Sequence, residues 1–370
     1  MSFAKHPLLN EVPEELFYRE ADSASAYCRS QIERYRRKGR AETKRIVSLA
    51  KKIAKSDLPN RELICQSLFE ALSPNHLDEP TVRQFYDYRI GESFTGSMVT
   101  QTAIERALWV ERHKSSPERV LGNKIIARSF AKSLGLTLPG LLQCNVPASE
   151  IAVREGTVVK PCFASASKGV FVIKNGDCVL DLKNRELIGE AELRSRIALL
   201  LSTGTIRKDR WQIEELVTAK FLCQLDVKFY CFYGRVALVL EARRYPEVRY
   251  NWYNAGGDQI TTGSDEGLEF NGEGVTAQEI ASVAEISLEI PVPFIRVDFL
   301  RSEDGSLVFG EFTPRPGEFH TFNSVTDSSL GREYNAALAR LNDDILMGKS
   351  FAAFPRQQGS GLKRHSTAEK

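Results

Sequence analysis

The chain has 370 residues, more than one ordinary hydrophobic core organises, so we expect two or more packed units. Hydrophobic residues make up 42% and charged residues 26%, and the net charge of +2 excludes a uniformly basic nucleic-acid-binding chain and an acidic disordered one. Residues 29–55 depart from this balance, with 11 basic and 2 acidic side chains, a local charge of +9. This basic arm is either a solvated helix face or a site for an anionic partner such as an acidic glycan, a membrane surface or RNA.

Cysteine usage and hydropathy bear on the cellular compartment. The seven cysteines are odd in number and contain no C-x-x-C pair, which argues against a disulfide framework or a zinc ribbon. No run approaches 18 apolar residues, and the first residues lack the apolar stretch of a secretory signal. We therefore expect a cytoplasmic protein.

The first third of the sequence has helical periodicity. Helices are expected over 23–39, 41–55 and 61–72, and the second carries Ile46 and Ile53 on one apolar face. A further helix is expected over residues 123–134. This pattern predicts a helical N-terminal region over residues 1–115.

From about residue 156, short β-branched and aromatic runs alternate with turns. Two more helices are signalled, one by the capping box Thr276–Glu279 and one by the apolar stripe of Leu330–Ile345. Residues 356–370 are polar and basic, as in a disordered tail. The body is therefore predicted to be α+β with mostly antiparallel strands, expected over 157–160, 170–173, 211–217, 225–232, 235–241, 294–300 and 307–312.

The densest chemistry lies in the predicted hairpin 294–312. Strand alternation places Arg296 and Asp298 on one face, and pairing could bring Asp298 opposite Glu311. Two close carboxylates repel unless a positive charge lies between them, and oxygen ligands that leave room for phosphate favour Mg²⁺. The alternative is a pair of exposed strand charges, with Asp298 paired to Arg296 or Arg301.

Three weaker signals accompany this hairpin. Lys160 ends a strand before the small-residue segment 161–169, which either cradles phosphate or is a polar turn. The strand 211–217 ends in two carboxylates and could lie along an adenine edge, or it is an ordinary strand with a charged end. Lys228 stands within a strand pattern, where its charge requires a carboxylate or a phosphate partner.

The order of these segments resembles the ATP-grasp superfamily over about residues 117–345. The segments D-V-K-F-Y-C-F-Y-G, G-E-F-T-P and D-S-S-L-G are most similar to its TupA-like branch, associated with teichuronopeptide and surface-polysaccharide biosynthesis. The resemblance implies an ATP-grasp fold of two α+β subdomains that clasp ATP. We assign the lysine and loop subdomain to residues 116–210 and the metal-binding subdomain to residues 211–355, which together make the domain 116–355.

The resemblance also implies residue roles. Phosphate lysines would be Lys124 and Lys160. The flexible loop would use Ser165, Ser167 and Gly169. Glu214, Glu215 and Val217 would contact the adenine or the ribose, and Lys228 would contact the phosphates or the acceptor. Arg296 would approach the transferred phosphoryl group, and Arg315 would lie where the acceptor loop begins. Asp298, Glu311 and Thr313 would bind Mg²⁺.

Three positions depart from the family pattern. Thr313 replaces the usual Asn of the metal strand, Asn123 replaces an Asp, and residues 163–166 read F-A-S-A where H-G-S-G is usual. A loop with less glycine has fewer accessible backbone conformations.

The implied activity is that of an ATP-dependent carboxylate–amine ligase. It would form an acyl phosphate, release ADP and then form an amide, in polysaccharide or peptide-conjugate biosynthesis. A phosphotransferase of the same fold and a non-catalytic scaffold protein are the alternatives. We expect Asp298→Ala and Glu311→Ala each to abolish ATP turnover and to leave the fold intact.

Overall fold

The computed structural model describes residues 92–112, 115–164, 167–217 and 225–355, together with Arg45, Ile46, Ser48 and Lys52. The chain divides after Asp87 into two units, and nearly all described residues lie in the second. The four residues near position 50 are helical and exposed, in agreement with the helix expected over 41–55. The helices expected over 23–39 and 61–72, most of the basic arm and the tail 356–370 lie outside the described residues.

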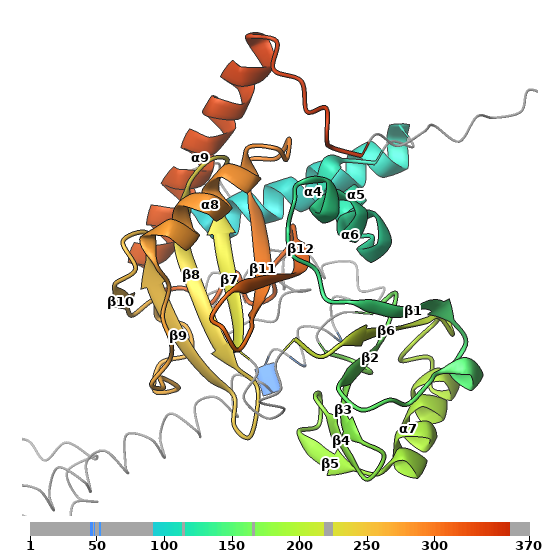
Figure 1. Cartoon of the computed structure of the whole chain (residues 1–370). Helices are drawn as coiled ribbons and strands as arrows, with labels where there is room; N and C mark the ends of the chain where they lie inside the picture. The colour runs from blue at the N-terminus through green and yellow to red at the C-terminus, as the bar shows by residue number, and fades with distance from the viewer. Residues whose placement is uncertain are drawn as a thin grey trace, which may run out of the picture. The chain divides into compact units, whose positions relative to one another are not determined.

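Two six-stranded sheets form the body of the second unit (Figure 1), and every strand pair described in them is antiparallel. This arrangement confirms the predicted α+β class. The first sheet has the order β1-β6-β2-β3-β4-β5, with β1 Leu141–Val146, β2 Thr157–Pro161, β3 Phe171–Asn175, β4 Cys178–Asp181, β5 Glu186–Ile188 and β6 Trp211–Glu215. The second has the order β10-β9-β8-β7-β11-β12, with β7 Leu225–Cys231, β8 Val236–Arg243, β9 Arg249–Asn254, β10 Gln259–Ile260, β11 Ile295–Arg301 and β12 Leu307–Thr313.

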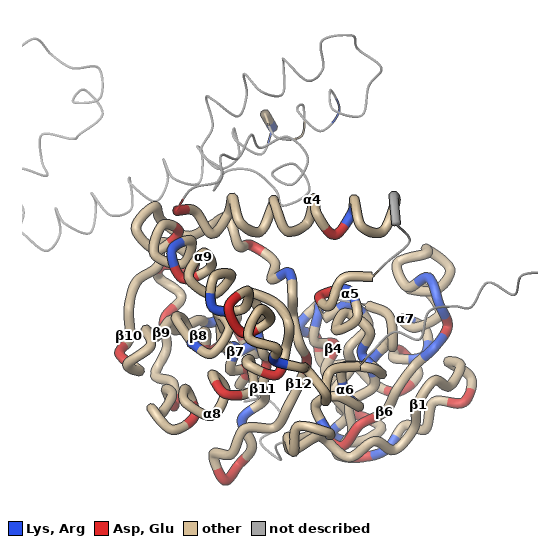
Figure 2. The backbone as a smooth tube through the Cα atoms, turned by 90° about the horizontal axis from the view of Figure 1, so that it is seen from above, with Lys and Arg blue, Asp and Glu red and all other residues tan. Residues whose placement is uncertain are grey.

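Helices cover the sheets and connect them. None of the described helices is long and apolar enough to cross a membrane. Helix α4 lies along α9, as Figure 2 shows from above. The helices are α4 Phe94–Arg112, α5 Pro117–Leu121, α6 Lys124–Ser133, α7 Glu190–Ser202, α8 Ala277–Ser287 and α9 Ser324–Leu346, with a 3₁₀ turn at Ala148–Glu150.

The first sheet has one covered face and one open face. Leu193 and Ile197 of α7 pack against the covered face, where Trp211 and Ile213 of β6 are almost fully buried. The opposite face carries apolar side chains as well, among them Val158, Val172, Leu180 and Leu182. An apolar surface on the open face is therefore available to a ligand.

The second sheet has an apolar face and a charged face. Val227, Phe229 and Val297 alternate inward and pack with residues of α6 and α8. Because side chains of a strand alternate between faces, the intervening Lys228 and Asp298 point to the other side. This alternation directs the charges of β7 and β11 toward the first sheet.

Several boundaries differ from those expected. Strands β1, β4, β5, β9 and β10 and helix α7 were not predicted, and α4 belongs to the second unit although residues 1–115 were assigned to an N-terminal region. Strand β6 pairs with β1 and β2, so the first sheet extends to Glu215 and the division expected at 210 falls inside it. Helix α9 begins at Ser324 rather than near Leu330, because Asn323 caps it by accepting from the backbone N–H of Thr326.

Candidate active site

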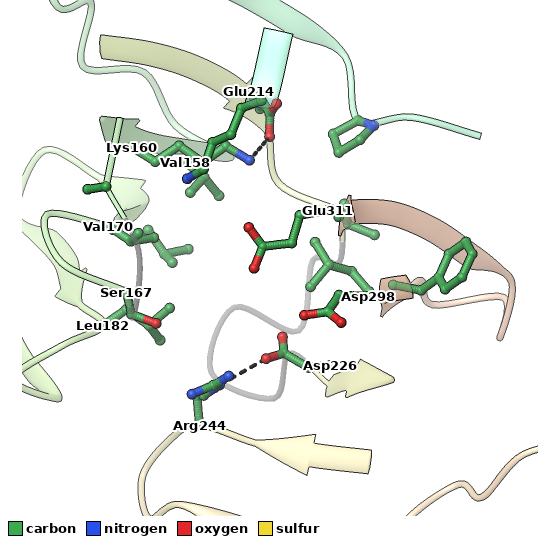
Figure 3. A pocket seen from close by; sticks show the side chains of 18 of the residues that line it. Val158, Lys160, Ser167, Val170, Leu182, Glu214, Asp226, Arg244, Asp298 and Glu311 are labelled. Carbon is green, nitrogen blue, oxygen red and sulfur yellow. Dashed lines mark hydrogen bonds and ion pairs between the residues drawn. The ribbon is translucent and has the colours of Figure 1, made fainter. Parts of the chain in front are cut away.

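A cavity that is partly open to solvent lies between the open face of the first sheet and the charged face of the second (Figure 3). The first half supplies an apolar wall and several charged residues, and the second supplies a charged wall. From the first half come, among others, Lys124, Val158, Lys160, Lys168, Val170, Val172, Leu182, Glu214, Glu215 and Val217. From the second come Asp226, Lys228, Arg244, Asp298, Phe299, Leu300 and Glu311.

Lys160 at the end of β2 forms an ion pair with Glu214 of the neighbouring strand β6. Its Nζ lies 2.6 Å from Glu214 Oε2, and Arg128 Nη1 of α6 lies 3.0 Å from Glu214 Oε1. Glu214 is only 5% exposed, so its charge needs these two cations. The pair holds the Lys160 ammonium at the cavity wall, as Figure 3 shows.

Lys124 is the first residue of α6, and Asn123 caps this helix through its side-chain oxygen. Burial lowers the pKa of Lys124, and the nearby charge of Lys160 lowers it further, whereas Glu311 and Glu214 act in the opposite direction. Two ammonium groups that face one cavity make a strong attraction for an anion. Because the Asn123 side-chain oxygen still accepts from the first turn of α6, the departure from the family's Asp at this position preserves the helix cap.

Asp298 of β11 is at the centre of the charged face. It lies opposite Glu311 of β12 on one side and opposite Lys228 of β7 on the other, which confirms the predicted hairpin register. Arg296 binds it with two hydrogen bonds of 2.7 Å, and Lys228 Nζ lies 3.1 Å from its Oδ2. Burial alone would raise the pKa of Asp298, but these two cations hold it below its usual range.

Lys228 also contacts a second carboxylate. Its Nζ lies 3.3 Å from Asp226 Oδ2, and Arg244 Nε lies 2.9 Å from the same oxygen. Burial would raise the pKa of Asp226, yet Lys228 and Arg244 lower it to about 2. Lys228 therefore lies between two ionised carboxylates, which confirms that its strand position requires an anionic partner.

Glu311 differs from Asp298. It is exposed, points into the middle of the cavity in Figure 3, and forms no ion pair with any residue that the structure describes. Thr313, two residues later on the same face, places its hydroxyl 3.4 Å from both Asp298 Oδ2 and the Arg296 guanidinium. Among the described residues of the cavity, Glu311, like Glu215 on the other wall, thus lacks an ion-pair partner, and it lies beside the neutralised Asp298.

A comparison with protein families decides where this chain belongs. The sequence model of the family described as TupA-like ATPgrasp matches residues 105–335, more than half of the chain. The chain belongs to the TupA-like ATP-grasp family. The match includes both sheets and every residue of the cavity named above.

The chain is also similar to several solved structures at low identity. The D-alanine–D-alanine ligase from Bacillus anthracis complexed with ATP is 14% identical, with coverage of 62% of this chain and 68% of that one and a TM-score of 0.37. D-cycloserine synthetase DcsG is 17% identical, with coverage of 65% and 80% and a TM-score of 0.35. The comparison with curated protein sequences finds no match.

Family membership implies a divalent cation, and the donor set fits one such ion. Within the described residues, no cluster of three or more His, Cys, Asp or Glu side chains could hold a metal by itself. Mg²⁺ needs no such cluster when it shares its coordination with phosphate oxygens and water. Glu311 has an unpaired carboxylate and Asp298 lies beside it, whereas Thr313 hydrogen-bonds to Asp298 and is a weaker candidate for a second ion.

The remaining predicted residues do not all line this cavity. Ser167 lines the cavity with a positive φ of 57°, and Gly169, at φ 69°, packs closely on Ile206; Ser165 lies outside the described residues. Arg315 lines an adjoining cavity instead. The structure therefore gathers Lys124, Lys160, Ser167, Glu214, Glu215, Val217, Lys228, Asp298 and Glu311 at one cavity, with Arg296 and Thr313 bonded to Asp298.

Sequence reasoning missed several residues of this TupA-like site. Asp226 precedes Lys228 by two residues on β7, so strand alternation could have placed both on one face. Arg244 follows β8 and reaches Asp226 of β7, a contact that no motif signals. The apolar wall residues Val158 and Leu182 carry no motif either.

Proposed function

We propose that this ATP-grasp protein is an ATP-dependent carboxylate–amine ligase that forms an amide through an acyl phosphate. One observation carries the proposal: the cavity opposes an apolar wall to a charged wall. Four lysines line this cavity, Lys124, Lys160, Lys168 and Lys228, together with Glu311, which forms no ion pair with a described residue. A nucleotide triphosphate with its Mg²⁺ has the matching division between an apolar base and a charged tail.

The apolar wall suits the base. Val158, Val172 and Leu182 offer an apolar surface on the first sheet, and Leu300, which shares a strand face with Asp298, lines the cavity from the second. Glu215 ends β6 and Val217 follows it at the same wall, and they would contact the base edge and the ribose. Apolar walls with a few placed polar groups are typical of cofactor pockets.

The charged wall suits the phosphates. Lys124 and Lys160 would neutralise phosphate oxygens from the first half, and Lys228 from the second. Glu311, with Asp298 beside it, would hold Mg²⁺, which when bound neutralises phosphate charge that develops during phosphoryl transfer. Asp298 would also keep the Arg296 guanidinium in place through its two hydrogen bonds.

The reaction would then depend on how the protein positions the reacting groups. A substrate carboxylate oxygen would attack the γ-phosphorus, ADP would leave with the electrons of the broken bond, and an amine would displace phosphate from the acyl carbon. Arg296 and the lysines would stabilise the charge of the transferred phosphoryl group, and loss of one such group typically slows an enzyme by about 10²–10³. By family association, we place this reaction in polysaccharide or peptide-conjugate biosynthesis.

An ADP-release screen with candidate uronic acids and amino acids, followed by mass spectrometry, tests the proposal. We expect ADP release that depends on both a carboxylate and an amine, with a product lighter by one water than the sum of its substrates. A phosphorylated product that accumulates in the presence of amines would instead identify a phosphotransferase. Failure of the protein to bind ATP would favour the non-catalytic alternative.

A further inference from the structure

Two further cavities continue from the nucleotide cavity toward α4 and α9. The second cavity shares Lys124, Lys160 and Glu311 with the first and also includes Arg315. The third cavity lies among α4, α5 and α9. Glu118 of α5 lines both the second and the third cavity, so these two spaces adjoin at this residue.

The third cavity has an apolar wall. Ile104 and Leu108 of α4 face Leu338 of α9, and Pro293 completes this part of the lining. Ile104 is 56% exposed and Leu338 is 41% exposed, so apolar surface at the cavity is accessible to a ligand from solvent. Burial of this surface would favour a ligand with an apolar body.

The end of the third cavity that adjoins the second is acidic. Glu105 and Glu118 are only 7% and 9% exposed, and the nearest cation is Arg315, whose Nη1 lies 3.5 Å from Glu105 Oε2. Arg315 itself is 42% exposed, so solvent weakens its compensation of two buried carboxylates. Burial raises the pKa of Glu118, and the neighbouring charge of Glu105 adds to this effect.

The polar groups around these carboxylates are neutral. Gln101 Nε2 lies 3.4 Å from Glu105 Oε1, and the Tyr334 hydroxyl donates to Gln101 Oε1 over 3.4 Å. Ser116 caps α5 and lines the same cavity. The side chains described here thus supply one exposed cation for two buried carboxylates.

We propose that the third cavity binds the apolar body of a primary amine, with its ammonium group between Glu105 and Glu118. As a role for the amine substrate, this rests on the ligase function proposed above. An ammonium group supplies the missing positive charge, and its three N–H donors suit two carboxylates. The amine nitrogen would then lie at the border of the second cavity, which leads to Lys124 and Glu311.

The same charges argue against other occupants of the third cavity. A carboxylate ligand would add a third negative charge, so the acid substrate belongs on the side of Arg315 and Lys124 in the second cavity. A purely apolar occupant would cover Glu105 and Glu118 without a new partner, and this is costly for ionised groups. The cavity is therefore selective for an amine over an alcohol or acid of equal length.

Isothermal titration of the full chain without nucleotide tests this site, with n-hexylamine, n-hexanol and hexanoate as probes. We expect saturable binding of hexylamine, at least about tenfold weaker binding of hexanol, and none of hexanoate, because a hydrogen bond to a charged group contributes about 1.5–3 kcal/mol. Equal affinity for hexylamine and hexanol would indicate an apolar docking groove and overturn the proposal. Absence of hexylamine binding would overturn it too.

Variants of the chain test whether hexylamine binds in the third cavity. Glu118→Gln should weaken hexylamine at least about tenfold and leave hexanol unchanged, and Thr100→Phe, which places a ring in the cavity, should abolish both. Ile345→Phe on α9 is the matched control, since Ile345 is half exposed and does not line the cavity. Because no ATP is present, hexylamine binding would survive a failure of the ligase proposal, and ligase activity without hexylamine binding would overturn the amine site alone.

Discussion

The two walls of the nucleotide cavity are built in different ways. The open face of the first sheet is mostly aliphatic, and its charged contribution is the Lys160–Glu214 pair with Arg128. The facing side of the second sheet is a continuous network in which Lys228 joins Asp226 to Asp298. An apolar wall can accept a planar group without strict orientation, whereas a network of paired charges fixes the direction of every polar atom.

This difference predicts a division of labour. Substitutions on the first wall should change affinity for the base, and substitutions on the second wall should change the handling of phosphate and metal. Lys160 belongs to the first sheet but carries a charge, so its substitution should change the binding of phosphate rather than of the base. The following experiments test that division from the largest expected effect to the smallest.

The largest effect is expected on the second wall. Glu311→Ala should reduce ADP release by at least about 100-fold without a change in unfolding free energy, because Glu311 is exposed. Asp298→Ala should reduce ADP release as strongly and also destabilise the fold by about 3–5 kcal/mol, since it leaves Arg296 without its carboxylate and Lys228 with Asp226 alone. This replaces the expectation from the sequence that the Asp298→Ala variant keeps its fold intact. Urea unfolding beside the ADP assay separates the two variants, and equal stability of both would contradict the network.

Lys160→Met should weaken binding of both ATP and inorganic tripolyphosphate by about 10–100-fold, because it removes a charge-assisted contact worth about 1.5–3 kcal/mol. Lys174→Met is the matched control, since Lys174 is an exposed lysine of β3 outside the cavity. Calorimetric titration measures both ligands. A variant that lost ATP affinity and kept tripolyphosphate affinity would assign Lys160 to the base.

Leu182→Ala should weaken ATP about fivefold and leave tripolyphosphate unchanged, because only the base contacts the apolar wall and about 1 kcal/mol of burial is lost. Leu187→Ala on β5 is the control, as Leu187 is half exposed and lies outside the cavity. The same titrations apply. Equal losses for both ligands would remove the distinction between the walls.

A separate prediction concerns the pH dependence of stability rather than ligand affinity. Lys228 and Arg244 hold the pKa of Asp226 at about 2 against the effect of burial, so this carboxylate contributes stability above its ordinary pKa of about 3.9. That contribution, on the order of 2 kcal/mol, should be lost as the pH falls from about 5 to 2. Asp226→Asn should show a flatter fall in unfolding free energy over this window, and parallel curves would contradict the assigned pairing.

Local sequence patterns predicted much of the site. The turn 302–305 and the alternation of β11 and β12 predicted that Asp298 lies opposite Glu311, and the register confirms it. The buried position of Lys228 likewise predicted an anionic partner, and it has two. Both inferences work because a hairpin and an alternating strand are set by neighbours in the sequence.

Contacts between segments that are distant in the sequence could not be predicted. Strand β6 joins the first sheet because Trp211 and Ile213 fill its core, which the sequence of β6 alone does not indicate. The Arg128–Glu214 pair joins residues 86 positions apart. Helix α4 was not predicted as a separate element, and its packing on α9, which forms the third cavity, could not be foreseen.

The Mg²⁺ dependence of nucleotide binding tests the central claim most directly. Calorimetric titration of the wild-type chain and of Glu311→Gln with a non-hydrolysable ATP analogue, with and without Mg²⁺, compares the two walls in one experiment. We expect Mg²⁺ to strengthen wild-type binding at least about tenfold and to have little effect on the variant, while both bind the metal-free analogue equally. The same Mg²⁺ dependence in wild type and variant, or no analogue binding by the wild-type chain, would contradict the assignment of this cavity.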